Sequence, residues 1–160
     1  MYDLDNVARD FPWTAVPDGG APVELWRAPE SNWFSEIPPG WGDVIEKYLK
    51  RLDKLVKRNN WNIYVAQVKE KFGTLRFYVD ILGDDSFPQY SDENPDIRAF
   101  YDIIHEMEAE TGEVCCDCGT RDDVKCYGGW IHYACPTCEK KRIEEYNRRM
   151  EEYKASKEQK

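Results

Sequence analysis

The spacing of six cysteines in the last third of this 160-residue chain constrains its fold more than any other feature. Cys115 and Cys118 form one C-x-x-C pair, followed at once by Gly119, and Cys135 and Cys138 form a second pair. A C-x-x-C turn lets two thiolates reach one ion, and a glycine after it supplies the left-handed backbone that such a turn needs. Four thiolates favour Zn²⁺, so we predict one structural zinc ion held by these four cysteines.

The segment between the two pairs predicts how the ligands are arranged. Two β-prone runs flank Gly128-Gly129, which indicates a tight hairpin, and Pro136 suits the first turn of a helix. A turn with two ligands, a hairpin, and two ligands at the start of a helix is the order of a treble-clef zinc site.

The other two cysteines are expected to lie outside the metal site. We expect Cys116 to turn its side chain away from the ion and Cys126 to be a buried packing residue of the hairpin. Two alternatives stay open: a site of three cysteines with His132 as the fourth ligand, and an iron–sulfur cluster on four thiolates.

The chain before the cysteines predicts an α+β body. Apolar residues at helical spacing predict helices over 42–58 and 95–111. Two alternating β-prone runs predict a hairpin over 62–82, with a bulge at the short link Glu70–Gly73. The fold class is therefore α+β, with a hairpin or small antiparallel sheet packed against helices and a treble-clef-like zinc module that runs into a C-terminal helix.

Three segments follow from this organisation. Residues 1–40 are rich in Pro and Trp, so we interpret them as an extended arm laid over the core by its aromatic side chains. Residues 41–112 form the α+β body, and residues 113–160 form the zinc module and its C-terminal helix.

Composition and charge indicate the compartment of the protein and argue against membrane and nucleic-acid partners. No apolar run has the length of a bilayer span and the N-terminus lacks a signal pattern, so we expect a soluble, cytoplasmic protein without membrane contact. A net charge of −9 repels nucleic acid. Residues 139–160, with eight Lys and Arg against six Glu, are the exception, and we interpret them mainly as a solvated helix.

Several blocks resemble a family of small uncharacterised proteins from tailed phages, prophages and bacteria. The similar blocks are Pro39-Gly40-Trp41, Val68 to Tyr78 (VKEKFGTLRFY), the C-x-x-C-G turn, Gly128-Gly129-Trp130 and the second cysteine pair. The resemblance implies an accessory protein of phage type acting in the cytoplasm of a bacterial host cell. The genes that accompany such proteins imply a role in countering a host defence factor.

The VKEKFGTLRFY block carries the candidate binding residues. Lys69, Lys71 and Arg76 are cations interleaved with aromatic side chains, among them Phe72. They could form a platform for a phosphate, a nucleotide or an acidic protein surface, or simply the polar face of a hairpin, paired with the acidic loops. Trp130, beside the zinc module, is a further candidate for partner contact, although we expect it to be buried.

Catalytic interpretations are not supported by the residues. His105 and His132 are the only histidines, and they form no recognisable nucleophile–base pair. We predict a non-catalytic zinc protein that acts by binding another protein. The alternatives are a nucleic-acid-binding zinc finger and a protein that binds a small nucleotide signal.

The C-terminal helix bears on assembly. Ile143, Tyr146, Met150 and Tyr153 follow the spacing of a coiled-coil seam. Two heptads are short for a dimer, so we expect this seam to pack on the body of the same chain, and a homodimer stays an alternative.

Overall fold

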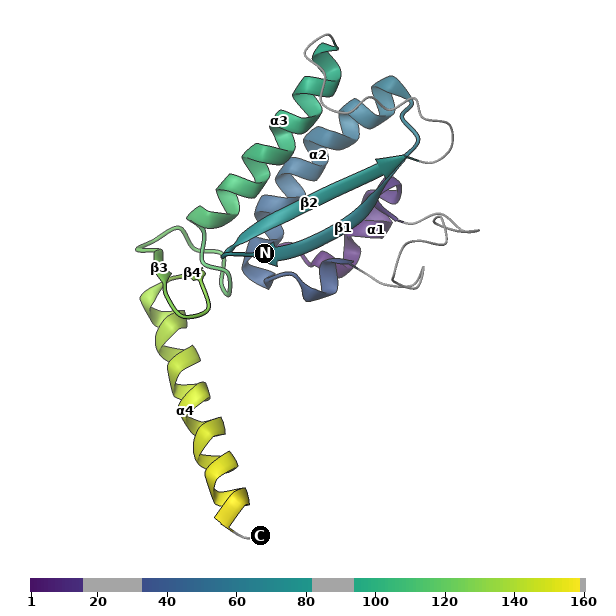
Figure 1. The fold of residues 1–160 in the computed structure, drawn as a ribbon. Helices are drawn as coiled ribbons and strands as arrows, with labels where there is room; N and C mark the ends of the chain where they lie inside the picture. Colours follow the sequence, from purple (N-terminus) through teal and green to yellow (C-terminus); the bar gives the residue numbers. More distant parts are fainter. Residues whose placement is uncertain (16–32, 82–93, 159–160) are drawn as a thin grey trace.

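The computed structural model describes residues 1–15, 33–81 and 94–158, and the fold class is α+β, as predicted (Figure 1). Two helices and a long β-hairpin form the body, a short hairpin follows, and a last helix leads away from it. The principal elements are α2 (Gly42–Asn59), β1 (Ile63–Lys71), β2 (Thr74–Ile81), α3 (Pro95–Glu110), β3 (Lys125–Tyr127), β4 (His132–Ala134) and α4 (Pro136–Glu158).

Helices α2 and α3 pack side by side in opposite directions. Lys47 pairs with Glu110 at 2.6 Å, near the start of one helix and the end of the other, while Arg58 of the last turn of α2 pairs with Asp96 of the first turn of α3. The apolar stripe of α2 faces the core through Val44, Ile45, Tyr48, Leu49, Leu52, Leu55 and Val56. Amphipathic helices of this kind are held mainly by burial of that stripe.

Local sequence signals set the helix ends. Asn60 ends α2 in the left-handed conformation, with φ of 52°, and its N–H bonds the carbonyl groups of Lys57 and Val56. Asn94 caps α3, because its side chain accepts hydrogen bonds from the N–H groups of Asp96 and Ile97.

The long hairpin differs from its prediction at the turn. Phe72 and Gly73 form a two-residue turn with φ of 55° and 79°, a combination of positive φ angles that matches the right-handed twist of the strands. The bulge expected at this link lies instead between Val65 and Gln67. Residue 82, the end of the predicted hairpin, lies outside the described residues.

The outer edge of β2 is covered by α3 and the turn after it. The Leu75 N–H donates to the Thr111 hydroxyl at 3.0 Å, and the Phe77 N–H donates to Glu108 at 2.8 Å. Thr111 belongs to a short 3₁₀ turn, η5 (Thr111–Glu113). These bonds satisfy edge donors that would otherwise be free to pair with another strand.

The described parts of the predicted N-terminal arm form short helical turns, so the extended interpretation is wrong for them. The turns are η1 (Leu4–Asn6), α1 (Val7–Asp10), η2 (Pro12–Thr14), η3 (Trp33–Glu36) and η4 (Pro39–Trp41). Pro12 and Pro39 open two of these turns, because the fixed φ of proline suits a first helical position. Leu4, Val7, Phe11, Phe34, Ile37 and Trp41 belong to the core. Residues 16–32, with the remaining Pro and Trp of the arm, lie outside the described residues.

Helix α4 does not pack on the body, contrary to expectation. Its seam residues Ile143, Tyr146 and Tyr153 are all more than half exposed, and the helix points away from the rest of the described chain (Figure 1). Among the residues that the structure describes, none of the helices combines the length and apolar character that a bilayer crossing requires.

Candidate metal centre and hairpin tips

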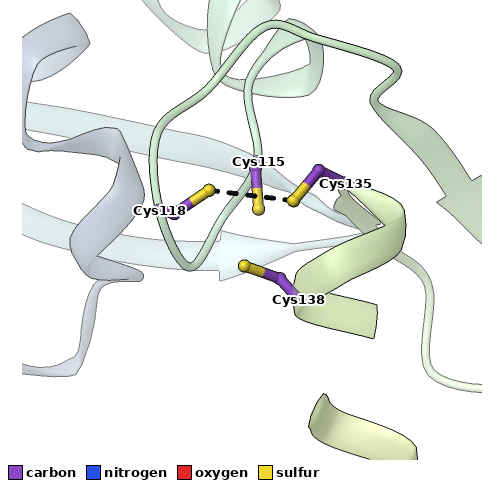
Figure 2. Close-up of side chains that lie close together, drawn as sticks. All are labelled: Cys115, Cys118, Cys135 and Cys138. Atoms are coloured by element: carbon purple, nitrogen blue, oxygen red, sulfur yellow. Dashed lines mark hydrogen bonds between the residues drawn. The ribbon is translucent and has the colours of Figure 1, made fainter. Parts of the chain in front are cut away.

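The four predicted ligands converge on one point. The Sγ atoms of Cys115, Cys118, Cys135 and Cys138 all lie within 4.8 Å of one another and face a common centre (Figure 2). The Cys118 and Cys135 sulfurs are 3.8 Å apart. A tetrahedral ion with metal–sulfur bonds of about 2.3 Å gives sulfur–sulfur edges of about 3.8 Å, so the geometry fits one metal ion.

Two backbone turns bring the sulfurs together. In the first, the Gly119 N–H bonds the Cys115 carbonyl at 2.9 Å and the Cys115 N–H bonds the Thr120 carbonyl at 2.8 Å, with Gly119 at φ of 74°. In the second, Cys135 follows β4 directly and Cys138 lies in the first turn of α4, which begins at Pro136 as predicted. The metal site therefore joins the short hairpin to the base of α4.

The surroundings of Cys115 favour a thiolate. Burial acts to raise the pKa of the Cys115 thiol, but hydrogen bonds from backbone groups of Cys118, Cys135 and Asp117 lower it to about 7. Cys116 differs, because burial, followed by the Asp117 charge, raises its pKa to about 11. The Cys115 environment suits a metal-binding thiolate, whereas that of Cys116 suits a neutral thiol.

The residues expected outside the metal cluster do lie outside it. The Cys116 sulfur accepts a hydrogen bond from Arg142 at 3.2 Å instead of facing the centre. His132 is not a fourth ligand, since its Nδ1 lies 2.8 Å from the Trp130 carbonyl oxygen and its Nε2 lies 2.6 Å from Glu139. His105 is exposed on α3.

Cys126 contradicts its prediction as a buried packing residue. It is exposed. The physical reason is that β3 has only three residues and pairs with β4 in an isolated two-stranded ribbon, so its outer face has no core to join.

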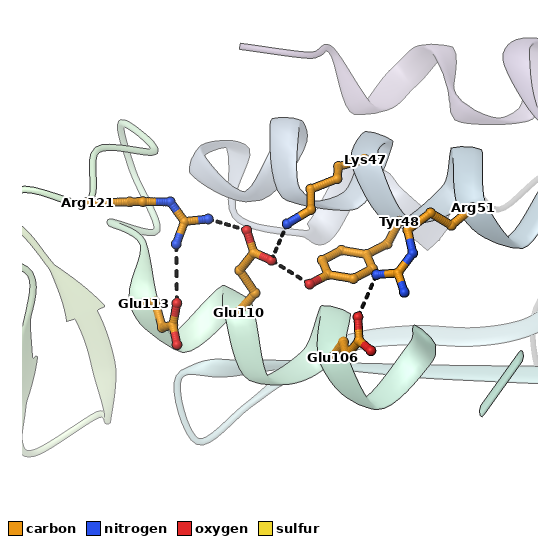
Figure 3. Close-up of polar contacts among 7 residues, drawn as sticks. All are labelled: Lys47, Tyr48, Arg51, Glu106, Glu110, Glu113 and Arg121. Atoms are coloured by element: carbon orange, nitrogen blue, oxygen red, sulfur yellow. Dashed lines mark hydrogen bonds and ion pairs between the residues drawn. The ribbon is translucent and has the colours of Figure 1, made fainter. Parts of the chain in front are cut away.

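Polar contacts fix the metal module, which comprises the two cysteine turns, β3, β4 and α4, to the body. Arg121, just beyond the first cysteine turn, pairs with Glu110 and Glu113, while Lys47 and Tyr48 of α2 donate to the same Glu110 carboxylate (Figure 3). Burial acts to raise the pKa of Glu110, but the hydrogen bonds from Lys47 and Tyr48, together with the nearby cations, hold it below its ordinary value. One carboxylate therefore links α2, α3 and the metal module.

The long hairpin also rests on the short one. A Cβ on Gly73 would lie 2.8 Å from the Tyr133 ring and 3.3 Å from the His132 Cα, so the turn of the long hairpin sits directly on β4. This contact places the two hairpin tips, which are far apart in the sequence, side by side.

The tips form an exposed apolar groove. Its cavity of about 260 Å³ is lined by Glu70, Lys71, Phe72, Gly129, Trp130 and Ile131, which we name the tip surface. Phe72 is 65% exposed and Trp130 is 78% exposed. Our expectation that Trp130 is buried was wrong, because the loop of residues 128–131 reaches beyond both short strands and none of the described residues packs over its end.

The three candidate cations of the long hairpin do not share one site. Lys71 lines the tip surface, with its Nζ 5.3 Å from the centre of the Phe72 ring. Lys69 and Arg76 are cross-strand partners farther along, where Lys69 donates to Gln67 at 2.5 Å and Arg76 donates to Thr74 at 2.7 Å. The sequence analysis missed Ile131 and Gly129 as groove residues, since only the contact at Gly73 brings them beside Phe72.

Comparisons with known proteins give no relative: no protein-family model matches the sequence, and no curated protein or solved structure matches it significantly.

Proposed function

We propose that this chain is a non-catalytic, zinc-stabilised module that binds another protein through its tip surface. The observation that carries the proposal is the position of Phe72. This large apolar residue is exposed, adopts a left-handed backbone conformation that favours Gly or Asn, and lies in one groove with the exposed Trp130.

Zinc is the metal that best suits the cluster. Four thiolates at tetrahedral spacing favour Zn²⁺, and a site with four protein ligands leaves no open position for water or substrate. A closed site of this kind contributes to folding rather than to chemistry. The order of turn, hairpin and helix around the cluster is that of a treble clef, and it supports the proposal of a zinc-braced short hairpin whose tip lines the tip surface.

Phe72 and Trp130 are better explained by binding than by stability. A bulky side chain at positive φ costs folding free energy. Because both rings are exposed, the fold also lacks the hydrophobic stabilisation that their burial would give. Aromatic side chains in a groove, with a cation at the rim, are typical of the residues that anchor protein interfaces. The tip surface therefore fits a partner that inserts an apolar side chain between the two rings and places an acidic group near Lys71.

The charge of the chain favours a protein partner over nucleic acid. The net charge is −9, and within the groove Glu70 stands beside Lys71. Phosphate binding gains its free energy from clustered cations that release counterions, and the tip surface offers one Lys.

The resemblance to phage, prophage and bacterial proteins gives the class of partner to test first. It favours a protein of the bacterial host, with a defence factor as the specific hypothesis.

Affinity capture from bacterial lysate tests the proposal. The zinc-loaded protein is compared with the Phe72→Ala/Trp130→Ala double variant, and Tyr78→Ala is the matched control, since Tyr78 is a partly exposed aromatic residue of the same hairpin outside the tip surface. We expect a protein that is retained by the wild type and by Tyr78→Ala but lost by the double variant.

Zinc content and circular dichroism of all three proteins must match for this comparison to hold. Equal capture by the wild type and the double variant would reject the tip surface as the binding site.

A further inference from the structure

Within residues 1–15, 33–81 and 94–158, the contacts that hold helix α4 lie at its base. Cys138 joins the metal cluster, Glu139 bonds His132 at 2.6 Å, and Arg142 donates to both carboxylate oxygens of Asp117 at 2.8 and 2.9 Å. Beyond Arg142, the helix extends away from the body (Figure 1), and Ile143, Tyr146 and Tyr153 are all more than half exposed. The metal module thus presents about four turns of free helix.

One stripe of this free helix is apolar. Ile143, Tyr146, Met150 and Tyr153 are spaced by three, four and three residues, so they lie on one face over about 15 Å. Three of them are more than half exposed. An exposed stripe with this spacing is the seam by which one helix packs against another.

The residues beside the seam carry positive charge. Lys140 and Lys154 flank it on one edge, and Arg149 flanks it on the other, where Arg142 is already paired with Asp117. Asn147 and Ser156 fill the remaining flanking positions. Four glutamates lie away from the seam, at Glu144, Glu145, Glu151 and Glu152, and Glu139, which is in line with the seam, is bonded to His132. Arg149 pairs within the helix with Glu145, an exposed ion pair that a partner can replace.

These flanks oppose pairing with a second copy. In a parallel pair, Arg149 of one helix would face Lys154 of the other, and in an antiparallel pair each basic edge would face its own counterpart. A partner helix with basic residues at its flanking positions is repelled by these cations, whereas a partner helix with acidic residues there is attracted.

We propose that the seam of α4 is a second docking surface, which binds an amphipathic helix with acidic residues beside its own apolar stripe. The surface is separate from the tip surface and does not depend on the proposed function. It would let the chain hold two segments of one partner, or two partners at once.

A designed peptide tests this directly on the full-length, zinc-loaded protein. The probe is a helix of about three heptads with Leu at the seam positions and Glu at all flanking positions, and a peptide with Lys at those positions is its control. Fluorescence anisotropy is expected to show saturable binding of the acidic peptide and at least tenfold weaker binding of the basic one.

Variants separate the seam from general electrostatics. Tyr146→Gln/Met150→Gln is expected to abolish binding while the helix persists by circular dichroism. Arg149→Glu/Lys154→Glu is expected to weaken binding of the acidic peptide at least tenfold and to strengthen binding of the basic peptide. Lys141→Glu/Arg148→Glu, which changes the same charges on the opposite face, is expected to change affinity less than threefold.

Four outcomes would overturn the proposal. The first is the absence of acidic-peptide binding, and the second is equal loss of binding in both charge-reversal variants. The third is sedimentation as a dimer that Tyr146→Gln/Met150→Gln dissociates, which would assign the seam to a second copy. The fourth is tighter binding of duplex DNA or single-stranded RNA than of the acidic peptide, which would assign the seam to nucleic acid. Phe72→Ala/Trp130→Ala is expected to leave peptide binding unchanged.

Discussion

Gly40 of the η4 turn and Gly119 of the first cysteine turn meet backbone to backbone. A Cβ on Gly119 would lie 2.8 Å from the Gly40 carbonyl oxygen, and a Cβ on Gly40 would lie 2.1 Å from the Cys115 carbonyl oxygen. The Gly40 N–H donates to the Cys116 carbonyl at 2.8 Å across the same contact. The first cysteine turn is therefore docked on the body at a distance that only glycine permits.

Gly40→Ala tests this docking. Because the added methyl group would overlap backbone atoms that no side-chain rotation can move, we expect the free energy of unfolding to fall by about 1–3 kcal/mol. Thermal or urea unfolding measures the change. Gly128→Ala is the control, since a Cβ at Gly128 meets nothing within 4 Å, and its effect is expected to stay within about 0.5 kcal/mol. Equal effects of the two variants would show that the contact is not tight.

Phe72→Asn separates stability from binding. Asn-Gly is the favoured pair for a two-residue turn with positive φ at both positions, so the variant is expected to raise the free energy of unfolding by about 1 kcal/mol. The same variant should weaken capture of the partner, because the ring is gone from the tip surface. A variant that is less stable than the wild type would remove the argument that Phe72 is retained for function.

Cysteine variants test the ligand assignment. Cys118→Ser and Cys135→Ser are expected to lose zinc and to unfold the region from Glu113 onward, because metal affinity contributes folding energy here. Cys116→Ser and Cys126→Ser should keep one zinc per chain, as measured by elemental analysis. Release of zinc by Cys126→Ser with retention by Cys138→Ser would show that the assignment is wrong.

The Glu110 carboxylate predicts a pH-dependent contribution to stability. Its pKa is lower in the folded chain than in the unfolded chain, so its contribution is fully present above the unfolded pKa and is lost as the pH falls through the folded pKa. At pH 7, Glu110→Gln is expected to lower the free energy of unfolding by about 1–3 kcal/mol, since Lys47, Tyr48 and Arg121 lose a charged acceptor. The difference between wild type and variant should shrink below about pH 4. A difference that stays constant from pH 7 to pH 3 would contradict this.

Signals within a few residues were enough to predict much of the fold. Apolar spacing within 42–58 and 95–111 predicted the two helices of the body, and the two C-x-x-C pairs predicted their shared cluster. Each of these depends on chemistry that neighbouring residues supply.

Features that depend on distant contacts were missed. Trp130 and Cys126 were expected to be buried because their residue types usually are, but in the described part of the chain no layer covers the short hairpin to bury them. The groove itself depends on Gly73 lying against Tyr133, a contact between segments that no local pattern links. The apolar spacing within α4 shows that the helix has a seam, but it does not show whether the body has a surface on which that seam can pack.

Photo-crosslinking from single positions tests the tip surface most directly. A photoreactive phenylalanine analogue replaces Phe72 or Trp130 in turn, and Tyr78 in the control, and each zinc-loaded protein is irradiated in bacterial lysate. We predict one shared crosslinked protein from positions 72 and 130 and none of that species from position 78. Crosslinks from position 78 alone, or different and non-reproducible products from positions 72 and 130, would contradict the proposal that the two hairpin tips form a protein-binding site.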